Sequence, residues 1–214
     1  MISIAVAFIP LALYFFALAV LNGGLRARML TGQEDLTALA LGLIGFVMVG
    51  PMLYVLPIDA LAFWGYKTWF FLALLYALMA WFLGAVFRFR VVIYNIGMNE
   101  LRDILEKIGQ ELDAEARWAG NSLALPTLGI QFYLERTSFL RNVTLKACGT
   151  RQNLQGWLHF EKSLRNALLQ HRATQKNCVP MLMAAVGFLM MTGAVIILIT
   201  YRMETMQSLW FLLQ

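Results

Sequence analysis

The chain has 214 residues, of which 60% are hydrophobic and 14% are charged, with a mean hydropathy of +0.67 and a formal net charge of +5. A soluble globular protein carries about 25% charged residues, so this composition excludes an ordinary soluble domain as a description of the whole chain. The shortage of charge is concentrated in four runs without Asp, Glu, Lys, Arg or His, at 2–21, 38–56, 69–87 and 179–201.

Each of these runs predicts a membrane-spanning helix. About 20 residues of α-helix span a hydrocarbon core of about 30 Å, and a charge at the centre of such a helix would cost about 2.5–3.5 kcal/mol. The first run has no basic residue before it and is longer than the apolar part of a signal peptide, so we expect it to be a membrane helix as well.

The second run carries signals for its start, its packing and its end. Thr31 and Glu34 have the spacing of a capping box, which predicts that a helix begins there. Gly42 and Gly45 share one helix face, and small residues allow close helix packing in membranes. Packing inside the bundle is the interpretation we favour, with self-association through this face as the alternative. Gly50-Pro51 is expected to bend or end the helix.

Aromatic and basic residues mark the two expected membrane surfaces. The segment 57–69 is rich in aromatic rings, which settle at the level of the lipid headgroups. We therefore expect it to lie along the outer surface, while two arginines follow the third run on the other side. The predicted membrane-interface residues are Phe63, Trp64, Tyr66, Trp69, Arg88 and Arg90.

The polar insert between the third and fourth runs predicts a small α+β domain with the element order βαβββα. β-Branched and aromatic residues predict a strand at 91–94, and period-two alternation predicts strands at 122–125, 130–135 and 143–147. Period-3.6 patterns predict helices at 100–113 and 153–172. Asn99 is the predicted N-cap of the first helix. We expect the two helices to cover one face of a four-stranded sheet. The predicted apolar stripe of the second helix is Leu154, Trp157, Leu158, Leu164 and Leu168.

The distribution of Lys and Arg predicts the orientation in the membrane. Six basic residues border the runs on the side of the polar insert: Arg26, Arg28, Arg88, Arg90, Arg172 and Lys176. Only Lys67 and Arg202 lie on the other side. This predicts a plasma membrane (bacterial inner membrane) protein with both termini outside. Three membrane helices then occupy 1–90, the cytoplasmic domain occupies 91–176, and the fourth helix with a short outer tail occupies 177–214.

The sequence contains few residues of the types that carry catalysis or bind metals. The chain has two His and two Cys, with no CxxC pair, P-loop, GxGxxG, GxSxG or HExxH motif. We therefore expect no enzyme activity, no cofactor and no metal. The apolar spans also lack the ionisable groups that a coupled pump needs.

The charge of the insert points to surfaces that bind partners. Between Arg88 and Lys176 there are 13 Lys and Arg against 8 Asp and Glu, and the acids gather in the first helix. Basic residues near the membrane favour contact with the inner leaflet or with a protein partner, and the predicted set is Lys162, Arg165, Arg172 and Lys176. Gly187 and Gly193 are predicted packing positions in the fourth helix. No aromatic platform or motif for nucleic acid is present.

The function that these features favour is a non-enzymatic membrane scaffold or regulatory subunit. Its cytoplasmic domain would bind a protein partner or a small ligand, in addition to the lipid bilayer around its helices. An oligomeric channel or a transporter component is the alternative, because a pore can be gated by a hydrophobic constriction.

Overall fold

A computed structural model describes residues 2–50, 62–86, 89–137, 141–149, 152–171 and 178–201. The chain divides into two compact units. The first, the helical unit, comprises 1–18, 36–85 and 182–214. The second, the α+β unit, comprises 19–35 and 86–181, so it includes the link between the first two apolar runs as well as the polar insert.

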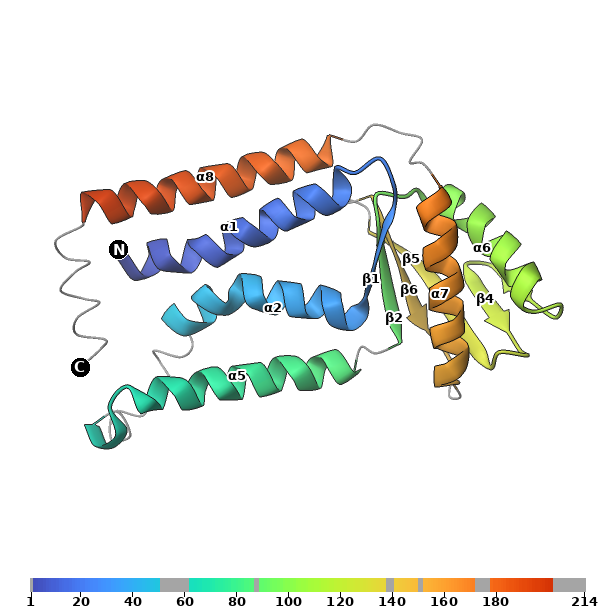
Figure 1. The fold of residues 1–214 in the computed structure, drawn as a ribbon, viewed down its shortest axis with the longest axis horizontal. Helices are drawn as coiled ribbons and strands as arrows, with labels where there is room; N and C mark the ends of the chain where they lie inside the picture. Colours follow the sequence, from blue (N-terminus) through green and yellow to red (C-terminus); the bar gives the residue numbers. More distant parts are fainter. Residues whose placement is uncertain are drawn as a thin grey trace. The chain divides into compact units, whose positions relative to one another are not determined.

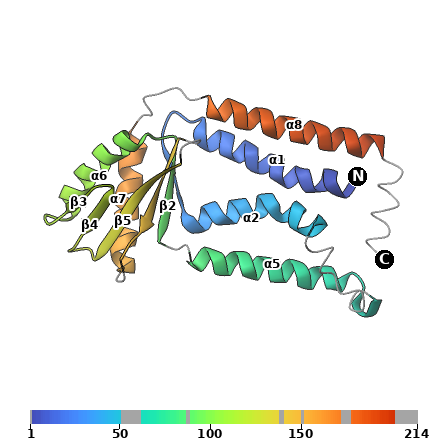
Figure 2. The same ribbon diagram turned by 180° about the vertical axis from the view of Figure 1, so that it is seen from behind.

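The four apolar runs correspond to helices α1 (Ile2–Asn22), α2 (Gly32–Val49), α5 (Lys67–Val86) and α8 (Val179–Thr200). Among the described residues, α2, α5 and α8 are long and apolar enough to cross a membrane, and α1 is apolar over Ala7–Asn22. In the helical unit α8 lies beside α1, α1 beside α2, and α2 beside α5 (Figures 1 and 2). The structure thus confirms three apolar helices of spanning length.

Small residues bring these helices close together. A Cβ atom at Gly42 would lie 2.7 Å from Cβ of Tyr14, and one at Gly45 would lie 2.7 Å from the backbone of Ala7. Both glycines therefore face α1. On the other side of α1, a Cβ atom at Gly187 would lie 3.1 Å from the carbonyl oxygen of Ala12. The described neighbours of Gly193 leave its Cβ position open to 4 Å.

The start of α2 has the predicted capping box. The backbone N–H of Thr31 donates to Oε2 of Glu34 (2.8 Å), and the backbone N–H of Glu34 donates to Oγ1 of Thr31 (3.2 Å). These two bonds satisfy donors that would otherwise be unpaired at a helix start. The helix ends at Val49 and Gly50 forms a turn, as predicted, while Pro51 lies outside the described residues.

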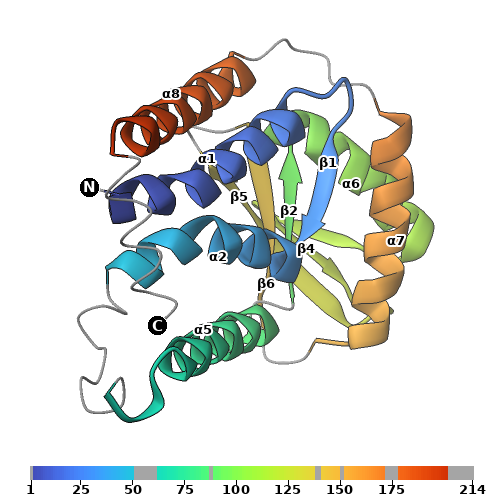
Figure 3. The ribbon, with the colours of Figure 1, turned by 60° about the vertical axis from the view of Figure 1, so that its left-hand side comes forward.

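The sheet of the α+β unit is antiparallel and has six strands, not the four that the sequence predicted. Its order is β1-β2-β6-β5-β4-β3. The strands are β1 (Arg28–Thr31), β2 (Arg90–Tyr94), β3 (Arg117–Ala119), β4 (Ser122–Leu125), β5 (Ile130–Thr137) and β6 (Asn142–Ala147). The edge strand β1 comes from the link before α2 (Figure 3), so the unit is not built only from the insert between the third and fourth runs.

Two helices cover one face of this sheet, as predicted. They are α6 (Met98–Leu112) and α7 (Leu154–Gln170), and they contact each other. Leu101, Leu105 and Ile108 of α6 share a core with Trp157, Phe160, Leu164 and Leu168 of α7 and with inward-facing residues of the strands. Burial of this apolar surface is the main favourable term for folding.

Two local predictions about the helices are wrong. Leu158 is 57% exposed, whereas Phe160 is fully buried, because the buried stripe of α7 is centred on positions 157, 160, 164 and 168. Asn99 lies inside α6, and the N-cap is Gly97, whose backbone N–H donates to Oε2 of Glu100 (3.4 Å). From inside the first turn, the side chain of Glu100 therefore pairs a backbone N–H at the start of the helix.

The buried carboxylate of Asp113 organises the connection after α6. It accepts hydrogen bonds from the backbone N–H and Oγ1 of Thr127 (2.7 Å each) and from the backbone N–H of Glu115 (2.9 Å). Burial acts to raise the pKa of Asp113, but these hydrogen bonds outweigh it and the pKa lies below its ordinary value. Asp113 thus joins the end of α6 to the loop before β5.

Gln152 joins the start of α7 to the sheet. Its Oε1 accepts from the indole Nε1 of Trp157 (3.0 Å), and its Nε2 donates to the carbonyl oxygens of Gln131 (3.0 Å) and Cys148 (2.5 Å). One side chain therefore connects α7, β5 and the end of β6. Next to it, the side chain of Asn153 caps α7 by accepting from the backbone N–H of Gln155 (3.0 Å).

Candidate functional site

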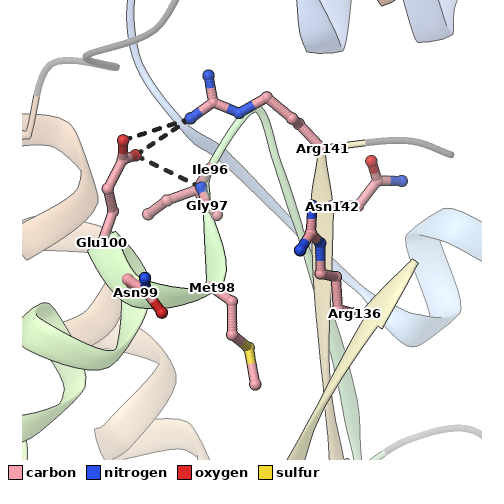
Figure 4. A pocket seen from close by; sticks show the side chains of 8 residues that line it. All are labelled: Ile96, Gly97, Met98, Asn99, Glu100, Arg136, Arg141 and Asn142. Atoms are coloured by element: carbon pink, nitrogen blue, oxygen red, sulfur yellow. Dashed lines mark hydrogen bonds and ion pairs between the residues drawn. The ribbon is translucent and has the colours of Figure 1, made fainter. Parts of the chain in front are cut away.

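An open pocket of about 380 Å³ lies where α6 begins beside the ends of β5 and β6 (Figure 4). Strand pairing explains its position, because β2 leads into α6 through a short turn, and at the same edge of the sheet β5 ends and β6 begins. We call it the α6 pocket. Its lining residues are Ile96, Gly97, Met98, Asn99, Glu100, Arg136, Arg141 and Asn142.

The charged residues of the α6 pocket are two arginines and one glutamate. A terminal nitrogen of Arg141 lies 3.3 Å from Oε1 of Glu100, so these two form an ion pair. Arg136 is exposed, and it takes part in none of the ion pairs found among the described residues. The pocket therefore holds one more guanidinium than carboxylate, which suits a carboxylate or phosphate group because guanidinium binds both through paired N–H donors.

Arg90, a predicted membrane-interface residue, takes part in a second polar cluster. It is the first residue of β2, and its guanidinium lies 3.5 Å from Oδ2 of Asp35. The phenol of the buried Tyr94 donates to Oδ1 of the same carboxylate (2.5 Å). Nearby, Nδ2 of Asn95 donates to the carbonyl oxygen of Gly24 (2.6 Å). These contacts fasten β2 to the segment that carries β1 and the first turn of α2.

The other predicted membrane-interface residues lie before α5, in its first turn, or after it. Phe63, Trp64 and Tyr66 are exposed, and Trp69 in the first turn of α5 is half-buried. The rings of Trp64 and Phe71 pack edge to face with centroids 4.9 Å apart. Arg88 lies outside the described residues.

The structure places half of the predicted basic contact set. Lys162 and Arg165 are exposed on α7, while Arg172 and Lys176 lie outside the described residues. Lys162 and Arg165 are three positions apart, so they share one side of the helix. Lys162 and Arg165 belong to α7 and do not line the α6 pocket, whereas Arg136 and Arg141 do.

The α6 pocket was not predicted as a site, although its arginines were recognised as part of the basic charge. Arg136 and Arg141 lie five residues apart, at the end of β5 and just before β6, whereas Glu100 in α6 lies more than thirty residues earlier, and no local motif connects it to them. Among the described residues no group of three or more His, Cys, Asp and Glu side chains is placed to hold a metal ion.

Comparison with protein-family models, curated proteins and solved structures found no match to this chain. The functional argument therefore rests on the residues and their geometry.

Proposed function

We propose that this protein is a non-enzymatic membrane scaffold or regulatory subunit whose α+β unit binds a protein partner or a small ligand at the α6 pocket. The observation that carries the proposal is the open pocket with an excess guanidinium, set in a unit that has its own closed core. The charged residues of the pocket are not among the members of that core, so they can serve recognition. Its chemistry favours a ligand or partner that presents a carboxylate or a phosphate.

The proposed setting is a plasma membrane crossed four times, by α1, α2, α5 and α8. Three of these helices have the length and composition for a span, and α1 forms one continuous helix over Ile2–Asn22. The excess of basic residues beside the insert supports a cytoplasmic α+β unit and outer termini. In this arrangement the α6 pocket binds a cytoplasmic ligand.

The test compares Arg136→Gln with Lys107→Gln in the full chain reconstituted in nanodiscs. Lys107 is an exposed cation on α6 outside the pocket, so this control removes the same charge from the same region. We expect inorganic phosphate or succinate to raise the unfolding temperature of the wild type and of Lys107→Gln. Loss of a charged hydrogen bond of 1.5–3 kcal/mol should weaken binding to Arg136→Gln about tenfold or more.

A protein partner is tested with the same pair of variants. Crosslinking in membranes followed by mass spectrometry should recover a partner with the wild type and Lys107→Gln, and recover less of it with Arg136→Gln. Recovery that does not depend on Arg136, together with the absence of a thermal shift, would contradict the proposal. Ion conduction by the purified protein in liposomes would then favour the channel alternative.

A further inference from the structure

The outer surface of α7 has two faces of different composition. At 3.6 residues per turn, its two exposed leucines and its two cations fall within about 80° of the helix circumference, together with the half-buried Leu154. Leu158 and Leu169 are 57% and 54% exposed. We call this the leucine–cation face, and it consists of Leu154, Leu158, Lys162, Arg165 and Leu169. The adjoining arc is polar and carries Gln155, His159, Asn166 and Gln170.

Glu161, at the border of the leucine–cation face, is influenced by a charge in the first turn of α2. Strand β1 packs beside α7 and continues directly into α2 at Gly32 (Figure 3). Glu161 borders this face. Burial raises its pKa, the guanidinium of Arg165 lowers it, and the carboxylate of Glu34 raises it. Glu34 belongs to the first turn of α2, so the pKa of Glu161 responds to a charge at the start of that helix.

Chain connectivity keeps α7 close to the bilayer. The segment 171–178 joins the end of α7 to α8, and a chain of eight residues spans at most about 29 Å. The α+β unit is also tied to apolar helices through β1 and β2. If α2, α5 and α8 cross the membrane, as proposed above, α7 cannot move far from the lipid surface.

The composition of the face favours lipid over protein as its occupant. Leucines beside lysine and arginine are typical of helices that lie in the headgroup region, where the apolar chains insert and the cations extend to anionic lipids. The face contains no aromatic residue, whereas aromatic residues are enriched and lysine is depleted in protein interfaces. The acidic residue of α7, Glu161, is half-buried at the border of this face.

We propose that the leucine–cation face of α7 lies against the anionic headgroups of the membrane in which the chain is anchored, with Leu158 and Leu169 inserted among them. This inference rests on the membrane arrangement proposed above and identifies anionic phospholipid as the partner of this face. The contact holds the α+β unit in one orientation, so that the α6 pocket is presented on a fixed side.

The test measures quenching by lipids in the full chain. Cys148 and Cys178 are changed to Ser, and a fluorophore is attached at Leu169→Cys or, as the matched control, at Asn166→Cys on the polar arc. The two chains enter nanodiscs with headgroup-nitroxide lipid, made either of phosphatidylcholine alone or with 30% phosphatidylglycerol. We expect quenching at position 169 to exceed quenching at 166 at least threefold, and only in the anionic discs.

Charge variants test the role of the cations. The double variant Lys162→Gln, Arg165→Gln should lower the equilibrium constant for docking of α7 on the lipid about 30-fold, because each basic residue contributes about fivefold. Quenching at position 169 should then fall to the level at position 166. Gln155→Glu with Asn166→Asp changes the net charge equally on the polar arc and should leave quenching at 169 unchanged.

Three results would overturn the inference. Equal quenching at 169 and 166 in anionic discs would show that the face does not meet lipid. Quenching that is the same in neutral and anionic discs would remove the role of Lys162 and Arg165. An emission at 169 that is blue-shifted without quenching would mean that protein covers the face. Failure of the chain to enter the discs would instead contradict the membrane arrangement, and this inference with it.

Discussion

Gly156 lies where α7 comes closest to the loop before β5. A Cβ atom at this position would be 2.2 Å from the carbonyl oxygen of Leu128 and 3.1 Å from Cγ2 of Ile130. A backbone oxygen cannot rotate away as a side chain can, so α7 or the loop would have to move. Such overpacking costs about 1–3 kcal/mol. We predict that Gly156→Ala lowers the free energy of unfolding by this amount in urea titrations of the reconstituted chain.

Gly109 provides the matched control for Gly156. It is a buried helical glycine in the same core, but its Cβ position has neighbours at an ordinary 3.7 Å. Alanine is favoured over glycine in helices by about 1 kcal/mol, so Gly109→Ala should leave stability unchanged or raise it. Equal destabilisation by the two substitutions would show that close approach to Leu128 is not the cause.

Asp113 gives a prediction that depends on pH. In Asp113→Asn an amide N–H₂ group would face hydrogen-bond donors, and we expect a loss of about 1–3 kcal/mol at pH 7. Because the pKa of Asp113 is lowered in the folded state, its stabilising contribution is present above the ordinary pKa of about 3.9 and is lost as the pH falls through the folded value. The difference between wild type and variant should therefore shrink below about pH 4.

Denaturant titrations between pH 3 and pH 7 measure this difference. Asp103→Asn removes an exposed carboxylate from the neighbouring helix and controls for the change in net charge. A stability difference for Asp113→Asn that stays constant across the whole range would contradict the role assigned to the ionised carboxylate.

Among the elements, the apolar helices could be predicted from the sequence and the edge strands could not. Helix length in a membrane is set by a continuous local run of apolar residues, and the predicted and observed bounds agree closely for α1, α5 and α8. Strand β1 has only Met29 and Leu30 as apolar residues in a short polar link, and its pairing partner, β2, lies some sixty residues away. Strand β3 is three residues long, too short to show an alternation.

In helix α7, the period of the apolar pattern was not sufficient to predict which side of the helix is buried. Leu158 and Trp157 are both apolar, but they point to different sides of the helix. The sequence alone did not show which of these two sides packs against the sheet. The side of Trp157 packs against the sheet, because Phe160, Leu164 and Leu168 extend the same apolar side along the helix. The misassigned Leu158 is informative, because an apolar residue left exposed beside Lys162 is the basis of the leucine–cation face.

The contact between α1 and α2 can be tested through its glycines. In Gly45→Ala the new Cβ would meet the backbone of Ala7 at 2.7 Å, whereas in Gly193→Ala the described residues leave room for it. We predict that Gly45→Ala lowers resistance to unfolding by dodecyl sulfate by about 1–3 kcal/mol, and that Gly193→Ala does not. If Gly45→Ala instead changed the oligomeric state at unchanged monomer stability, the self-association alternative would be supported.

For the whole molecule, the sequence predicted which region binds partners but not the geometry of a binding site. The insert was predicted to carry the binding surfaces because the apolar runs lack ionisable groups. The α6 pocket forms only when the β5–β6 edge and the start of α6 come together, which depends on strand order and register rather than on a local pattern. In the sequence, Arg136 and Arg141 could be recognised only as part of the basic charge. In the structure, they line one pocket.

The proposed orientation can be tested with the two native cysteines. Cys178 is exposed just before α8, while Cys148 is half-buried and burial raises the pKa of its thiol. Because the thiolate is the reactive form, Cys148 should react more slowly than Cys178 near neutral pH. We predict that a membrane-impermeant maleimide labels Cys178 in inverted vesicles but not in intact cells.

Two variants assign this label to its residue. Cys178→Ser should abolish fast labelling in inverted vesicles, and Cys148→Ser should leave it unchanged. Both cysteines belong to the α+β unit, so the side on which Cys178 reacts is the side from which the proposed ligand would reach the α6 pocket. Fast labelling of Cys178 in intact cells would reverse the orientation inferred from the basic residues, and with it the compartment from which a ligand or partner must come.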